Sequence, residues 1–138
     1  MIEILHQNQF VQLILDKEIP AIYEKWIALC RPNEFRETLE KKLALYIENK
    51  DRFEQLHWMV DFRGLQWPDH DTEVWSVKEF HPKLYKSGVR FIAFVVPRDI
   101  FDELDEDSLL GKYDRNKEVY LRFFNTFEAA SDWLKRPQ

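Results

Sequence analysis

Cysteine is almost missing from this sequence, because Cys30 is the single thiol among 138 residues. One thiol excludes an internal disulfide, a zinc site built from several cysteines, and a CxxC redox motif. Scarce cysteine is also typical of proteins kept in a reducing compartment. We therefore expect a cytoplasmic localisation.

Long hydrophobic runs are lacking as well. No stretch approaches the roughly 18 consecutive apolar residues of a membrane-spanning helix, so the sequence predicts no transmembrane segment. The opening residues, MIEILHQNQF, have no basic region followed by an apolar run. A secretory signal peptide needs both features, and none is expected here.

Glycine is rare in the sequence, and basic residues are fewer than acidic ones. The three glycines form neither a GxGxxG nor a GxxxxGK[ST] loop, and the four histidines form neither HxH nor HExxH. We therefore predict no cofactor and no metal site. The 20 basic residues are outnumbered by 25 acidic ones, which gives a net charge of −5. That balance argues against nucleic acid as the main partner, because phosphate contacts need a basic surface.

What is present is the composition of a globular domain. Hydrophobic residues make up 45% of the chain, charged residues 33% and aromatic residues 15%. A chain of this length buries about two thirds of its unfolded surface, which suffices for one core. The prolines and glycines are scattered and no linker is visible, so we predict a single domain over residues 1–138.

Hydrophobic patterning predicts an alternation of strands and helices. Short β-rich or alternating runs predict strands at residues 2–5, 10–15, 21–27, 55–61, 91–96 and 119–124. Helical spacing of apolar residues predicts helices over 34–47, 69–86, part of 99–110, and 127–134. Strands that alternate with helices pair in parallel, whereas the first strands form an antiparallel meander. The predicted fold class is α/β, a mixed sheet of five to six strands with four helices, in the order ββ(β)αβαβαβα.

Several residues predict where the helices begin, bend and end. Asn33 is expected to cap the first long helix, and Asn125 or Thr126 the last one. Pro82 lies inside the second predicted helix and indicates a kink or a break there. Gly88 has the position of the glycine that follows a helix C-terminus.

Three segments of the sequence resemble those of a known family. They are Trp58 to Asp61 (WMVD), Gly88 to Val96 (GVRFIAFVV), and Tyr120 to Phe124 (YLRFF) running into Glu128 to Leu134 (EAASDWL). Together they make residues 8–135 similar to the STAS-like, SpoIIAA-like family of small bacterial proteins, and within it to a Bacteroidetes-type subgroup of unsettled function. The resemblance implies the fold given above.

The same resemblance indicates where a phosphorylation switch would lie in this sequence. In the anti-sigma-factor antagonists of this family, a Ser or Thr follows the strand-ending Asp and is phosphorylated by a partner kinase. Here residues 62–69 contain no hydroxyl side chain, and the nearest is Thr72. We therefore expect no phosphorylatable Ser/Thr switch.

The candidate binding site follows the central strand that ends at Asp61, since ligands of open α/β sheets bind beyond the carboxyl ends of strands. Its candidate residues are Asp61, Arg63, Gly64, Trp67, His70 and Trp75. In the functional interpretation, Arg63 contacts an anion beside an aromatic wall. In the structural interpretation, Asp61 caps backbone amides, Gly64 serves a turn and the tryptophans close the core edge.

Five tryptophans are many for one small core, and an exposed one would mark a binding patch. The first hypothesis is a non-enzymatic STAS-like regulatory module that binds another protein or itself through one face of its helices. The alternative is a carrier of a small apolar ligand or lipid, with a pocket near Arg63, Trp67 and Trp75. Catalytic residues are not predicted, because no nucleophile motif occurs.

Overall fold

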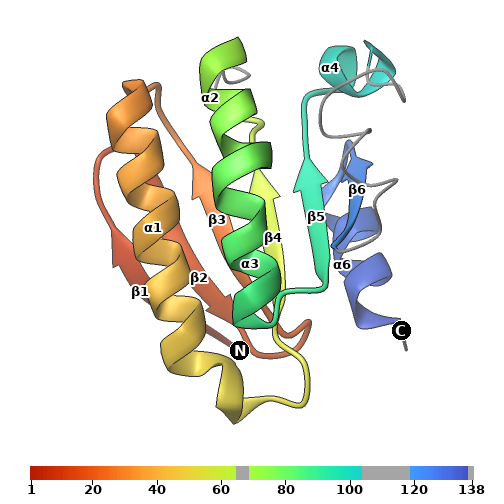
Figure 1. Ribbon diagram of the computed structural model, residues 1–138. Helices are drawn as coiled ribbons and strands as arrows, with labels where there is room; N and C mark the ends of the chain where they lie inside the picture. Colours follow the sequence, from red (N-terminus) through yellow and green to blue (C-terminus); the bar gives the residue numbers. More distant parts are fainter. Residues whose placement is uncertain (65–68, 104–118, 137–138) are drawn as a thin grey trace.

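The computed structural model describes residues 1–64, 69–103 and 119–136 (Figure 1). Its centre is one six-stranded sheet in which the strands lie side by side in chain order. The strands are β1 (Ile2–Gln7), β2 (Val11–Asp16), β3 (Ala21–Trp26), β4 (His57–Asp61), β5 (Phe91–Val95) and β6 (Tyr120–Phe124). Strands β1 to β3 pair antiparallel, and β3 to β6 pair parallel.

The helices follow the parallel strands. They are α1 (Pro32–Asn49), extended by the short 3-10 helix η1 (Lys50–Arg52), then α2 (His70–Trp75), η2 (Ser76–Phe80), α3 (His81–Ser87), α4 (Arg98–Glu103) and α6 (Phe127–Lys135). Since α2, η2 and α3 form one continuous helix, the described residues hold four main helices. The predicted fold class, an α/β fold with a mixed sheet and an N-terminal antiparallel meander, is confirmed.

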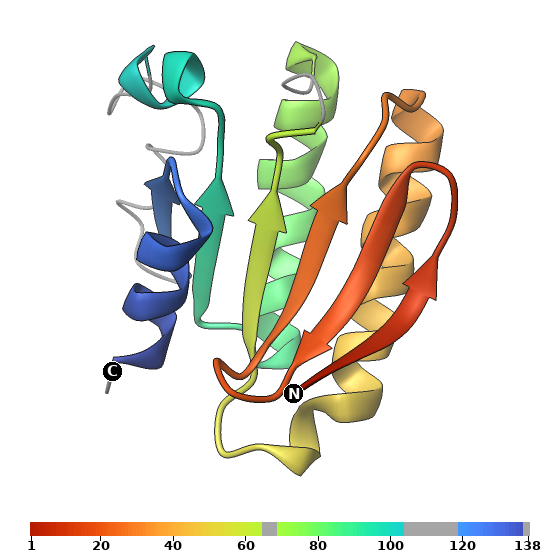
Figure 2. The same cartoon turned by 180° about the vertical axis from the view of Figure 1, so that it is seen from behind.

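The two faces of the sheet are covered unequally. Helix α1 and the helix α2–α3 lie over one face, here called the front face (Figure 1). Helix α6 lies over the opposite or back face, on the side of β5 and β6. Figure 2 shows that none of the described helices lies over β1 to β3 on the back face.

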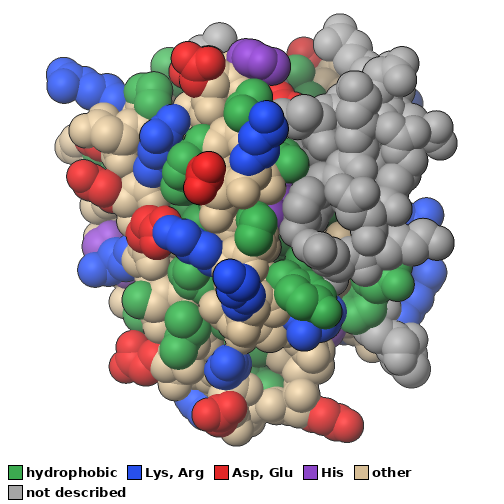
Figure 3. All heavy atoms as spheres, in the orientation of Figure 1, with side chains coloured by type: hydrophobic (Ala, Val, Ile, Leu, Met, Phe, Trp, Pro, Cys, Tyr) green, Lys and Arg blue, Asp and Glu red, His purple; other side chains and the backbone are tan. Residues whose placement is uncertain are grey.

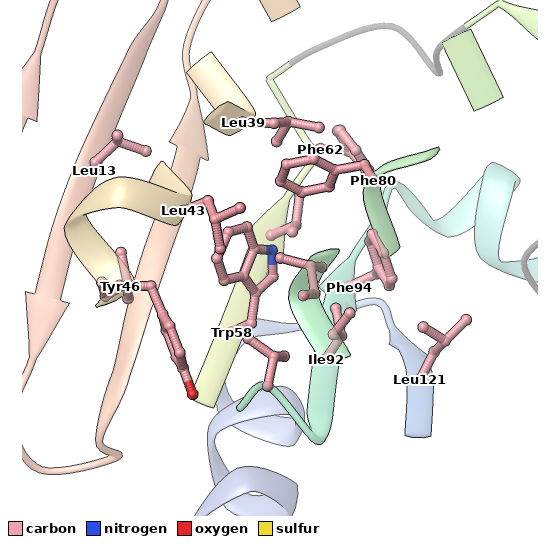
Figure 4. Packing of buried hydrophobic residues seen from close by; sticks show 14 of the residues in the cluster. Leu13, Leu39, Leu43, Tyr46, Trp58, Phe62, Phe80, Ile92, Phe94 and Leu121 are labelled. Carbon is pink, nitrogen blue, oxygen red and sulfur yellow. The ribbon is translucent and has the colours of Figure 1, made fainter. Parts of the chain in front are cut away.

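The larger part of the core lies between the front face and its helices. Trp58 stands near the centre of this cluster, and Tyr46 and Phe80 tilt against it at ring-centroid distances of 5.9 and 6.0 Å (Figure 4). A smaller back-face cluster joins Tyr23 and Met59 to Leu134 of α6. Side chains of β4 point alternately into the two clusters, which is why its five residues are all buried.

The helix ends test the predicted caps. Asn33 was predicted as the N-cap of the first helix, and this was wrong because α1 begins two residues earlier than predicted, at Pro32, with Arg31 as its N-cap. Proline suits the first helical position, since its missing N–H has no partner there in any case. The Arg31 N–H instead donates to Glu34 Oε1 over 2.9 Å. At α6 the prediction is confirmed, because the Ala129 N–H donates to Thr126 Oγ1 over 3.1 Å.

Of the kink or break predicted at Pro82, the structure shows a local π-helical turn, through which the helix continues. The turn η2, just before Pro82, is π-helical, and α3 begins at His81 with this proline in its first turn. A π-helical turn frees the carbonyl that the proline ring would clash with. Gly88 ends α3 with a φ of 107°, the left-handed conformation that glycine adopts without strain.

Two further predictions concern the rest of the chain. Of the helix predicted within 99–110, residues up to Glu103 are helical, and the remainder lies outside the described residues. In the described ranges, no helix has both the length and the apolarity needed to cross a membrane.

Candidate functional site

Asp61 lies at the carboxyl end of β4, and its carboxylate is engaged on both oxygens. The Tyr23 hydroxyl donates to Oδ2 over 2.6 Å, and Arg63 Nη2 donates to the same oxygen over 2.8 Å. Arg63 also donates its Nε and its backbone N–H to Oδ1, over 3.0 and 2.9 Å. Sequence analysis named Asp61 and Arg63 but missed Tyr23, which lies 38 residues earlier on the neighbouring strand.

This network fixes the protonation of its members. Burial raises the pKa of Asp61, but hydrogen bonds from Arg63 and Tyr23 outweigh burial and lower that pKa overall. The pKa of Tyr23 is raised by burial and by its bond to Asp61. Arg63 would have to release Asp61 to bind an external anion with the same edge of its guanidinium. The geometry therefore favours the structural interpretation of Asp61 and Arg63.

Gly64 has a role in packing. A Cβ atom at this position would lie 2.2 Å from the backbone oxygen of Trp26, which is far inside van der Waals contact. The chain after β4 thus passes directly against the end of β3, and no side chain fits between them.

His70 and Trp75 do not join Asp61. His70 is exposed in the first turn of α2, and Trp75 stacks on Phe80 at 5.4 Å with the Arg36 guanidinium 5.0 Å from its ring centroid. Trp67 lies outside the described residues. Trp75 therefore seals the gap between α1 and α2.

The cavity beside α2–α3 bears on the predicted apolar pocket. Its volume is about 30 Å³, and its lining includes Trp58, Phe62, Ser76 and His81. A space of this size holds about one water molecule. Figure 4 shows the aromatic side chains that fill the surrounding volume.

The core between the front face and its helices contains a charged pair that was not predicted from the sequence. Glu24 of β3 and Lys42 of α1 are both fully buried, with Nζ 3.2 Å from Oε1. Lys42 Nζ also donates to the Met59 carbonyl oxygen over 2.7 Å and lies 4.1 Å from the Trp58 ring centroid. The second Glu24 oxygen accepts from Trp26 Nε1 over 2.5 Å. Burial lowers the pKa of Lys42 in spite of the attraction to Glu24.

The pair left a weak signal in the sequence. Glu24 alternates with Ile22 and Trp26 on the strand face that enters the core, and Lys42 falls on the helical face of Leu39 and Tyr46. Glu24 and Lys42 are each a charged residue within an otherwise apolar pattern. Only the fold shows that the two residues face each other.

The most exposed apolar side chains are aliphatic, and Tyr85, Phe101 and Tyr120 are exposed to a smaller extent. Trp26 and Trp58 are 2% exposed, and Trp75 and Trp133 are half-buried, so none of these four forms an exposed patch. Instead Ile2 and Ile4 on the edge strand β1 are 59% and 53% exposed. Ile4 pairs with Ile14 of β2, and Ile14 pairs with Tyr23 of β3, so these side chains form one row on the back face.

A groove lies at the other end of the parallel strands, where β4 and β5 begin. Its volume is about 630 Å³. The groove lies beneath the C-terminal end of α6, which contributes Leu134, Lys135 and Arg136. His57 and Phe91 line it from neighbouring strands, with their rings edge to face at 5.8 Å. This groove was not predicted from the sequence.

Within the described part of the chain, no group of three or more His, Cys, Asp or Glu side chains is placed to hold a metal ion. Comparison of the chain with protein-family models, curated proteins and solved structures gave no match in any of the three. The resemblance to the SpoIIAA-like family stays a prediction, because an α/β fold class is shared by many unrelated families.

Proposed function

We propose that this chain is a non-enzymatic protein-interaction module that pairs with a second copy of itself through β1. The observation that carries the proposal is the edge strand β1, whose Ile2 and Ile4 side chains are more than half exposed on the back face. An edge strand offers unpaired backbone groups to another strand, and natural proteins usually protect such edges.

The outer backbone groups of β1 follow from its pairing with β2. The Lys17 N–H donates to the Met1 carbonyl oxygen over 3.1 Å. Antiparallel residues alternate between inward and outward backbone groups, so Ile2 and Ile4 direct theirs away from β2. A bulge between Ile4 and His6 limits the regular edge to the residues before it.

The strand is self-complementary. A two-fold axis normal to the sheet beside Ile4 sets the Ile4 side chains of two copies next to each other on the back face. The row formed by Ile4, Ile14 and Tyr23 then continues across the interface. In this register Glu3 faces Leu5, the bulge residue of the second copy, so no like charges face each other, and regular pairing is limited to the residues beside the axis.

The helix face offers less apolar surface than sequence analysis expected. In Figure 3, charged side chains of both signs are interspersed with hydrophobic ones over α1 and α2–α3. Ile47 on α1 is 48% exposed. We therefore place the interface on β1.

Two further observations support an interaction module over the other functions considered. Among the described residues, the cavity beside α2–α3 has a volume of about 30 Å³, which is too small for an apolar ligand or lipid, and Trp67 of the predicted pocket lies outside these residues. Lys42 and Glu24 form a charged pair that is fully buried in the core, so a substrate does not reach it.

The test is the oligomeric state of the purified chain, measured by native mass spectrometry and light scattering over a range of concentrations. We expect a dimer whose dissociation constant rises at least tenfold in Ile4→Lys, because the lysines of two copies would meet at the axis. Ile47→Lys is the matched control and should leave the dimer intact. A monomer at all concentrations, or a dimer lost in Ile47→Lys and kept in Ile4→Lys, contradicts the proposal.

A further inference from the structure

One flank of α1 lies beside the edge strand β1. A hollow of about 160 Å³ between them is lined by His6 of β1 and Lys41 of α1, among other residues. Burial and the ammonium group of Lys41 both lower the pKa of His6, which shows that the two side chains are neighbours. Glu40, on the opposite flank of α1, instead pairs with Lys83 of α3 over 3.1 Å. A second copy that pairs through β1 therefore approaches the flank that carries Lys41.

This flank of α1 carries charges of both signs. Residues four and seven positions apart lie on the same side of an α-helix, so Lys41, Leu45 and Glu48 share the flank. Lys41 and Glu48 are exposed, and Leu45 is half-buried. In the part of the chain that the structure describes, neither Lys41 nor Glu48 forms an ion pair within its own copy. Both charges are available to a neighbouring molecule.

The two-fold axis beside Ile4 passes level with Leu45. Helix α1 connects the parallel strands β3 and β4, so it runs opposite to them and to β1, which is parallel to β3. Ile4 precedes His6 by two residues, which is about 7 Å of strand. The same distance along α1 takes between about four and five residues. Counted from Lys41, the neighbour of His6, this leads to Leu45.

Rotation about this axis sets Lys41 of one copy beside Glu48 of the other. Lys41 and Glu48 lie on opposite sides of Leu45, at about 6 and 4.5 Å along the helix, and the rotation exchanges these sides. Figures 1 and 2 both show α1 over β1 and β2. Two helices that each lie over β2 are three strand spacings or about 14 Å apart, which leaves roughly 10 Å between facing Cα atoms. An extended lysine and an extended glutamate together bridge this gap.

We propose that, in the dimer formed through β1, Lys41 of each copy forms an ion pair with Glu48 of the other, and that these two ion pairs select the register of the β1 pairing. The inference rests on the proposed function, because it needs the β1 dimer. Moving the axis from Ile4 to Ile2 slides one copy past the other by about 13 Å and separates the opposite charges. Complementary charges at an interface mainly determine orientation and specificity.

Reversal of the two charges tests the proposal. Lys41→Glu gives the flank two acidic side chains, and Glu48→Lys gives it two basic ones. Each variant alone should raise the dissociation constant of the dimer at least about fivefold at low salt, because like charges then face each other twice. A mixture of the two variants restores both ion pairs, so it should form heterodimers well in excess of random pairing. Native mass spectrometry with one variant labelled with nitrogen-15 measures the heterodimer fraction.

The matched controls are Lys78→Glu and Glu79→Lys, which make the same charge changes at exposed positions of η2. They should leave the dissociation constant unchanged and pair with each other at random. Equal dissociation constants in all four variants, or random pairing of Lys41→Glu with Glu48→Lys, overturn the ion pairs and leave the β1 dimer in place. A chain that is monomeric without any substitution contradicts the proposed function, and the ion pairs with it.

Discussion

At the scale of single residues, the ammonium group of Lys42 depends on partners from three places in the chain. Glu24 supplies a carboxylate, Met59 a backbone oxygen and Trp58 a ring face. A buried ion pair contributes little net stability compared with apolar residues, but removing one partner leaves the other charge buried and alone. Removing only Lys42 or only Glu24 should therefore lower stability far more than replacing both residues together.

We expect Lys42→Met to lower the free energy of unfolding by about 3–5 kcal/mol, since Glu24 then remains buried without its cation. The double variant Lys42→Met with Glu24→Gln should recover much of this loss. Urea unfolding followed by circular dichroism measures both. Lys78→Met, at an exposed position of η2, is the control and should change stability by less than about 0.5 kcal/mol. A loss of under about 1 kcal/mol in Lys42→Met would show that Glu24 finds another partner or a proton.

The residues also show how far a site can be predicted from sequence. Asp61 was found because it ends a readable strand, and Arg63 because it follows closely. Tyr23, which decides how Asp61 is bonded, comes from a strand 38 residues away. His57 lies in the strand predicted at residues 55–61, but the sequence does not indicate that its Nδ1 has no partner among the described residues. The hydrophobic pattern of the sequence indicates which face of the sheet a side chain lies on. It does not indicate which atoms of a neighbouring strand that side chain contacts.

At the scale of elements, the hydrogen bonds that cap a helix contribute measurably to the free energy of unfolding. Thr126 caps α6 through its hydroxyl oxygen, which accepts from the Ala129 N–H. Because α6 covers β5 and β6 on the back face, its first turn also positions Phe127, whose ring stacks on Tyr23 at 5.1 Å.

We expect Thr126→Ala to lower the free energy of unfolding by about 1 kcal/mol, the usual cost of a lost N-cap. Thr126→Ser keeps the accepting oxygen and should stay within a few tenths of a kcal/mol of the unmodified protein. Thermal and urea unfolding of the three proteins provide the comparison. Equal losses in the two variants would assign the effect to the threonine methyl group.

The elements themselves were largely predictable. The bounds of β3 and β5 agree to within one residue with the strands predicted at residues 21–27 and 91–96. Short apolar runs between turn residues are typical of strands, which is why these two were predictable. The start of α1 was predicted at residue 34, which is too late because Pro32 occupies the first helical turn. Pro82 indicated a local break, but the π-helical form of η2 depends on packing that one sequence does not show.

At the scale of the whole molecule, the buried histidines link stability to pH. His81 is 3% exposed, and burial lowers its pKa to about 4, against about 6.5 in an unfolded chain. Between these values the unfolded chain binds the proton and the folded protein does not, so stability falls as pH falls through this window. The lowered pKa of His57 acts in the same direction.

We expect His81 to account for a loss of about 2 kcal/mol in the free energy of unfolding between pH 7 and pH 5. Urea unfolding at several pH values measures the slope, which should become shallower in His81→Gln. His70→Gln changes an exposed histidine of α2 and serves as the control. An identical slope in the unmodified protein and His81→Gln would mean that His81 is protonated within the fold.

The strands lie side by side in chain order, and this arrangement has a consequence for the making of the protein. Each strand from β2 onward pairs with the strand immediately before it in the sequence. When a ribosome releases such a chain from its N-terminus, every new strand emerges with its earlier neighbour already available. No described strand has to wait for a later segment to be inserted between it and its predecessor, so the sheet can grow from β1 outward as the chain is synthesised.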